Sequence, residues 1–112
     1  MRKELIKWAG GEHDFALSVP DLLALQDRCN GDGVGLIYSR LQAGIFGVND
    51  VLAPIALGLE RGGMDKRDAT TLTRTVFEDN GLNALALTAH AILSVSLNGW
   101  PDQEGEAGVE TP

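Results

Sequence analysis

The sequence predicts a mainly α-helical protein, a small bundle of about five helices that follows an N-terminal β-hairpin. Three observations support this prediction. Apolar residues recur at helical spacing in successive segments of the chain. Glycines or polar turn residues follow each of these segments and are typical of helix ends. Near the N-terminus, a Gly-Gly pair separates two short strand-like strings, which indicates a hairpin.

Length and composition indicate one domain with an acidic tail. The chain has 112 residues, enough for one modest hydrophobic core but not for two. We expect the domain to span residues 1–101. Residues 102–112, which read DQEGEAGVETP, are polar, acidic and rich in glycine, so we expect them to form a disordered tail.

The hairpin is expected within residues 4–17. Its arms are Glu4–Trp8 and His13–Leu17, on either side of a connection at residues 9–12 that contains both glycines. Because an isolated hairpin is only marginally stable in water, this one must pack on the helices.

The first two helices are bounded by capping and stop signals. Ser18 and Asp21 resemble a capping box at the start of the first helix, and a turn at residues 30–33 ends it. The second helix is predicted over about Val34–Leu41. Residues 42–48 are bounded by glycines and are expected to run extended.

The segment from Gly47 to Met64 contains the clearest helix. Asn49 is the expected N-cap, since its side-chain oxygen can accept a hydrogen bond from a free N–H of the first turn. Asp50 then lies where the helix dipole favours negative charge. Pro54 is expected near the end of the first turn, where a missing N–H costs least. The two glycines that precede Met64 end the helix.

Two further helices complete the bundle. The fourth is expected to start at Asp65 and to end at the string Glu78–Gly81, with one apolar face and one polar face. The fifth is predicted over about Leu82–Asn98 and has almost no polar side, so it must be buried by its own fold or by a partner. Gly99 closes it and Pro101 prevents its continuation.

Charge argues against direct binding of nucleic acid. The formal net charge is −7, from nine basic and sixteen acidic residues, and such a chain repels phosphate backbones. The two loose basic groups, Arg2/Lys3/Lys7 and Lys66/Arg67/Arg74, are interleaved with acids, so we expect solvated surface there. No apolar run reaches the roughly 18–20 residues of a membrane span, and no secretory signal is visible. Cys29 is the single cysteine, and a cytoplasmic protein is expected.

The chain offers no constellation for catalysis, a cofactor or a metal. His13 and His90 lie far apart without a paired cysteine or carboxylate motif, so they make no zinc signal. Residues 27–33 fail the calcium-loop pattern, because two ligand positions would be Cys29 and Gly31. Cys29 sits near a helix C-terminus, where a thiol is not activated. We therefore expect a protein that is not an enzyme.

Several strings resemble those of a known family. They are Gly11–Leu17, Leu23–Cys29, Ile37–Leu41, Val48–Met64, and Ala91–Leu93 with Asn98–Pro101. Over roughly residues 10–101 the chain resembles the tail assembly chaperones of siphophage-like tails, in particular the gene transfer agent branch found in alphaproteobacterial genomes. This branch has also been labelled a phage tail tube protein.

The resemblance implies a small helical protein that coats the long tape-measure protein until tube subunits displace it. The implied partners are the tape-measure protein, the tail tube protein, or both, and a homo-oligomer is possible; no direct nucleic acid and no membrane is implied. The alternative is a structural tail (tube) subunit of the particle. A tube subunit normally needs long strands, and the chain offers two short ones, so the chaperone is preferred. An enzyme or ligand-binding domain is the third hypothesis.

One apolar stripe is the expected partner-binding site. The third and fifth helices together carry more apolar residues than so small a domain can cover alone. We therefore expect a groove that includes part of the third helix and binds a helical segment of the tape measure or another copy of this protein. Its anchors are Val51, Leu52, Ile55 and Leu59.

Overall fold

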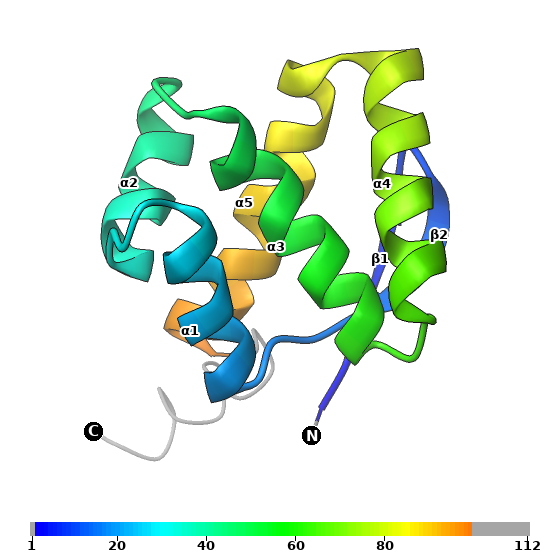
Figure 1. Cartoon of the computed structure of the whole chain (residues 1–112), viewed down its shortest axis with the longest axis horizontal. Coiled ribbons are helices and arrows are strands. Elements are labelled where there is room, and N and C mark those ends of the chain that lie inside the picture. The colour runs from blue at the N-terminus through cyan, green and yellow to red at the C-terminus, as the bar shows by residue number, and fades with distance from the viewer. Residues whose placement is uncertain (1, 100–112) are drawn as a thin grey trace, which may run out of the picture.

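The computed structural model describes residues 2–99 and confirms the predicted fold class. Five helices follow an antiparallel two-stranded hairpin (Figure 1). The predicted tail at residues 102–112 lies outside the described residues. The elements are β1 (Glu4–Trp8), β2 (Gly11–Phe15), α1 (Val19–Arg28), α2 (Val34–Ala43), α3 (Val48–Arg61), α4 (Lys66–Asn80) and α5 (Leu82–Asn98).

The hairpin turns more tightly than predicted. Trp8 pairs with Gly11, so only two residues connect the strands, and β2 begins two residues before the predicted His13. Gly11 adopts a φ of 116°, which a residue with a side chain rarely accepts. Trp8 donates a hydrogen bond of 2.9 Å from Nε1 to Nδ1 of His13, and its ring meets the edge of Phe15. These side chains lie on one face of the hairpin, the face that joins the core.

The helix ends confirm most of the capping predictions. Ser18 and Asp21 form the capping box at the start of α1, with hydrogen bonds in both directions. Asp65 caps α4 by accepting from two backbone N–H groups of its first turn. Helix α5 has the predicted bounds. Helix α2, in contrast, runs to Ala43 and α3 starts at Val48, so three of the seven residues expected to be extended are helical and the bridge is residues 44–47.

Helix α3 is the centre of the molecule. It contacts α1, α2, α4, α5 and β2, and Figure 1 shows it running through the middle of the bundle. Its N-cap is Gly47, not Asn49; glycine has no side chain to cap the helix, and Asp50 accepts a hydrogen bond from the Gly47 N–H. Because the helix starts at Val48, Pro54 falls in the second turn rather than the first. It therefore removes one backbone hydrogen bond inside the helix.

The hairpin reaches α3 through two glycines one helical turn apart. The N–H of Ala16 donates to the carbonyl oxygen of Gly58 at 3.2 Å, so backbone meets backbone. A Cβ atom on Gly62 would overlap the carbonyl oxygen of Asp14, and one on Gly58 would lie 3.0 Å from the ring of Phe15. The absence of side chains at these two positions is what lets the end of β2 lie against the helix.

Helices α4 and α5 complete the core from the other sides. Helix α5 packs on α3, α2 and β1, and Leu85, Ala89 and Leu93 are fully buried there. A single residue, Gly81, separates α4 from α5, and its φ of 86° makes the sharp corner possible. Among the described residues, no helix is long and apolar enough to cross a membrane by itself; α2 and α3 pass that test together but are bent by 116° at their break.

The glycine contact yields a matched pair of substitutions. Gly62→Ala should lower the free energy of unfolding by about 1–3 kcal/mol, because the hairpin must move away from α3. Gly35→Ala places the same methyl group in α2, where nothing lies within 4 Å, and should stabilise by up to about 1 kcal/mol. Urea unfolding measures both. Equal effects of the two changes would contradict the close approach.

Candidate interaction surfaces

A cluster of ionised side chains joins α2 to the start of α3. Arg40 donates from Nε and Nη2 to the two carboxylate oxygens of Asp50, at 2.8 and 2.7 Å, and from Nη1 to Asp32 at 2.8 Å. Asp50 is 4% exposed, and it also accepts from the Gly47 N–H. The carboxylate therefore caps its own helix and holds α2 at the same time.

The environment of this cluster shifts the pKa values of its members. Burial alone would raise the pKa of Asp50, but the hydrogen bonds from Arg40, Gly47 and the Cys29 thiol outweigh it and lower the pKa below 3.8. The pKa of Arg40 is raised by its two carboxylate partners. Burial, together with the hydrogen bond to Asp50, raises the pKa of Cys29 to about 11. The cysteine is thus a protonated donor in the core, as the sequence led us to expect of an inactive thiol.

These contacts indicate that the Arg40 cluster, which consists of Arg40, Asp32 and Asp50, stabilises the packing of α2 on α3. Its basic and acidic groups satisfy one another, and no buried side-chain nitrogen or oxygen within residues 2–99 lacks a partner. Sequence reasoning placed Asp50 at a helix start but missed Arg40, which lies ten residues earlier and reaches it only in the folded chain.

The cluster predicts a pH-dependent stability. Because the folded state lowers the pKa of Asp50, its contribution is present above pH 3.8 and is lost as the pH falls through the folded-state pKa. Asp50→Asn should lower the free energy of unfolding at pH 7 by about 2–3 kcal/mol, since it leaves Arg40 with less compensation. Urea unfolding at several pH values should show this difference shrinking in acid. Asp27→Asn, at an exposed position, is the control and should change stability by less than about 0.5 kcal/mol.

The predicted partner-binding stripe lies mostly inside the fold. Val51, Ile55 and Leu59 are each at most 1% exposed, so a partner cannot reach them in the folded chain. The reason is the central place of α3, whose apolar face is covered by the other elements. Leu52 alone of the four is partly exposed. Helical spacing identified the stripe correctly but could not tell whether the fold itself or a partner covers it.

The two histidines lie in different structural settings. His13 accepts the hydrogen bond from Trp8 in the hairpin, and His90 of α5 stacks on Tyr38 of α2 with 4.7 Å between the ring centres. Within residues 2–99, no group of three His, Cys, Asp or Glu side chains could hold a metal ion.

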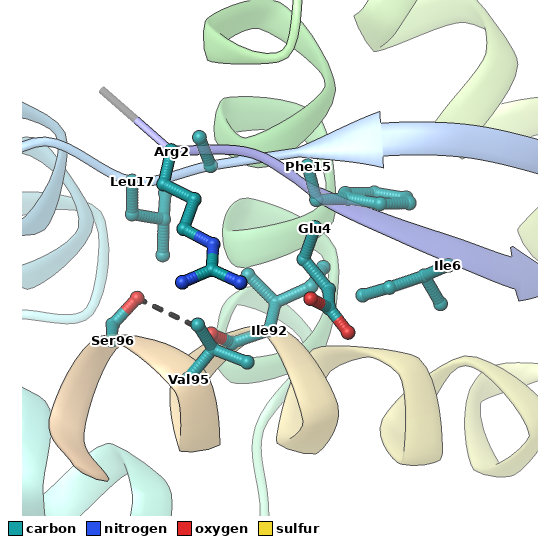
Figure 2. A pocket seen from close by; sticks show the side chains of 9 residues that line it. Arg2, Glu4, Ile6, Phe15, Leu17, Ile92, Val95 and Ser96 are labelled. Atoms are coloured by element: carbon teal, nitrogen blue, oxygen red, sulfur yellow. Dashed lines mark hydrogen bonds between the residues drawn. The ribbon is translucent and has the colours of Figure 1, made fainter. Parts of the chain in front are cut away.

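A cavity of about 220 Å³ lies between the hairpin and the C-terminal half of α5. Figure 2 shows Ile6, Phe15 and Ile92 on its apolar walls, and Arg2 and Glu4 extending into it from the N-terminal strand. The hydroxyl of Ser96 is already engaged, because it donates to the carbonyl oxygen of Ile92 at 3.2 Å. The residues that line the cavity are a mixture of apolar and charged side chains and include no paired nucleophile and base.

One uncharged surface combines α5 with the loop between α2 and α3. Residues 41–49 and 82–99 contain no Asp, Glu, Lys or Arg, although the whole chain carries a net charge of −7. Leu87 on α5 is 77% exposed and Ile45 in the loop is 71% exposed. Leu87 lines a hollow of about 410 Å³ together with His90 and with Phe46, the neighbour of Ile45 in the loop. We call this the α5 face.

Sequence analysis predicted one part of the α5 face, helix α5, and missed the other, the loop that contains Ile45. The apolar circumference of α5 indicated burial by the fold or by a partner, and the exposed Leu87 agrees with the second. Ile45 was missed, because residues 42–48 were expected to be a plain connection. An apolar Ile-Phe pair between glycines in an exposed loop was the signal that could have found it.

The fold and its surfaces define a helical protein whose exposed features suit protein–protein contact. Comparison with known families gives the more specific identification. The chain belongs to the family described as phage tail tube protein, GTA-gp10, whose model matches residues 4–99 and so includes all seven elements. No curated protein and no solved structure matches it. The predicted relation to a gene transfer agent or phage tail is confirmed, and the role is a structural one in such a tail.

Proposed function

We propose that the chain is a non-enzymatic structural subunit of the tail of a phage-like particle of the gene transfer agent type. The observation that supports the proposal is the family match over residues 4–99, because the members of that family are described as phage tail tube proteins. This reverses the order of the two hypotheses drawn from the sequence, which preferred the assembly chaperone. We place its synthesis and assembly in the cytoplasm of the bacterial host.

The α5 face supports this proposal, with a neighbouring tail protein as its occupant. Contiguous patches of exposed apolar side chains are typical of interaction surfaces. Charged residues are also depleted at the centres of protein interfaces, and the α5 face has none along α5 or the adjoining loop. A net charge of −7 elsewhere keeps such a subunit soluble before assembly.

The tail assembly chaperone stays as the second candidate because of the strand content. Within residues 2–99 the strands are β1 and β2, each of five residues. A ring lined by β-strands needs longer strands than these, whereas a helical protein can cover a helical segment of a tape measure. In that case the α5 face would bind the tape-measure protein transiently.

Mass spectrometry of purified particles separates the two candidates. A structural subunit should be present in a fixed ratio to the other tail proteins, many copies in each particle. A chaperone should be absent from finished particles and should co-purify with the tape measure from lysates. Absence from the particles would reject the subunit proposal.

Charge on the α5 face should block assembly without unfolding the protein. We expect the double variant Ile45→Glu, Leu87→Glu to keep its helical circular dichroism and to change stability by less than about 1 kcal/mol, because both side chains are exposed. The same variant should fail to enter particles in a strain that lacks the native copy. Leu5→Glu, Leu23→Glu is the matched control, at exposed leucines on other elements, and should still assemble. Normal incorporation of the first variant would show that the α5 face is not an interface.

A further inference from the structure

A second surface, separate from the α5 face, carries positive charge. A groove of about 160 Å³ lies between the end of α1, the first half of α3 and the middle of α4. None of the residues that line it is acidic, and two of them are arginines, although the chain as a whole is acidic. The lining residues are Arg28, Asn49, Leu52, Ala53, Ala56, Thr70, Thr73 and Arg74.

The two arginines of this groove lack charged partners. Arg28 and Arg74 are both exposed, and neither guanidinium forms an ion pair or a hydrogen bond with any residue that the structure describes. Arg40 and Arg61, in contrast, are held by carboxylates of the fold. Arg28 and Arg74 are therefore available to carboxylates from outside the described fold.

The floor and walls of the groove are fixed by the fold. Leu52, Ala53 and Ala56 form an apolar floor on α3. Asn49 donates from Nδ2 to the carbonyl oxygen of Arg28 at 2.9 Å, which ties the first turn of α3 to the end of α1. The hydroxyl of Thr73 is satisfied by the carbonyl oxygen of Ala69 at 2.7 Å. A ligand for this groove needs a small apolar group for the floor and carboxylates for the rim.

The chain itself contains a segment with this chemistry. Residues 102–112 contain four of the sixteen acidic residues and no basic one. Within them, Val109 follows Glu106 by three positions and directly precedes Glu110, so a small apolar side chain lies between two carboxylates. From Gly99, the remaining thirteen residues can span up to about 43 Å when extended, enough to reach beyond the fold that carries them.

We propose that the Arg28/Arg74 groove binds the acidic C-terminal segment, residues 102–110, of a second copy of this protein. Val109 would contact the floor at Leu52 while carboxylates of the segment pair with the two arginines. The choice of a second copy rather than the same chain rests on the proposed function, in which subunits lie beside one another. The charge match between groove and segment does not depend on that function.

Self-association of the full chain tests the proposal. Sedimentation velocity over a range of protein concentrations should show association at about 50 mM NaCl that weakens strongly at about 500 mM, since surface charge pairs are screened by salt. Arg28→Glu, Arg74→Glu should weaken association by about tenfold or more. Glu106→Lys, Glu110→Lys should weaken it to a similar degree.

A mixture of the two variants gives the decisive result. The groove of the first variant carries two glutamates and the segment of the second carries two lysines on either side of Val109, so an equimolar mixture should associate where each variant alone does not. Lys3→Glu, Lys66→Glu is the matched control: it makes the same change in net charge at exposed positions outside the groove lining and should associate like the parent. Circular dichroism verifies that every variant is folded.

Two outcomes would overturn the proposal. If the groove variant associates as strongly as the parent, the groove is not the site. If the parent is monomeric at every concentration and salt, the occupant is not a second copy. Neither result touches the mass-spectrometric test of the tail role, so failure here and failure of the proposed function can be told apart.

Discussion

The burial of α3 on nearly every side is the constraint on which the rest of the structure depends. Asp50 in its first turn is buried as a result, and its carboxylate is satisfied by the Gly47 N–H and by Arg40. The end of α3 must also accept the hairpin at backbone distance, which requires glycine at Gly62 and leaves little room for a side chain at Gly58. The same burial removed most of the predicted binding stripe from the surface.

Much of the fold could be predicted because the residues that begin and end each helix act on backbone groups close to them in the sequence. Ser18, Asp65 and the glycines act on backbone groups within a few residues, so the capping rules located α1, α4 and α5 well. The errors concern contacts between distant residues. Asn49 was expected to cap α3, but its side chain donates a hydrogen bond to the carbonyl oxygen of Arg28. The carboxylate at the start of α3 is that of Asp50, which also binds Arg40. No local pattern contains that information.

The two candidate interaction surfaces differ in charge. The α5 face has no formal charge and exposes Leu87 and Ile45, whereas the Arg28/Arg74 groove concentrates positive charge in an acidic protein. Sequence analysis found the apolar excess on α3 and α5 together but placed the anchors of the expected partner site on α3. It also treated Arg74 as ordinary solvated surface, because the other arginine of the groove comes from a helix more than forty residues earlier. Surfaces assembled from several helices were therefore the part least accessible to sequence reasoning.

The state of Cys29 has a practical consequence for work on the assembled particle. A buried thiol with a pKa of about 11 is ionised to only about one part in ten thousand at pH 7, so it reacts slowly with maleimides and other alkylating reagents. A cysteine introduced at an exposed site would then take a fluorophore or spin label selectively, with the native residue left in place. Site-specific labelling of this protein therefore does not require the removal of Cys29.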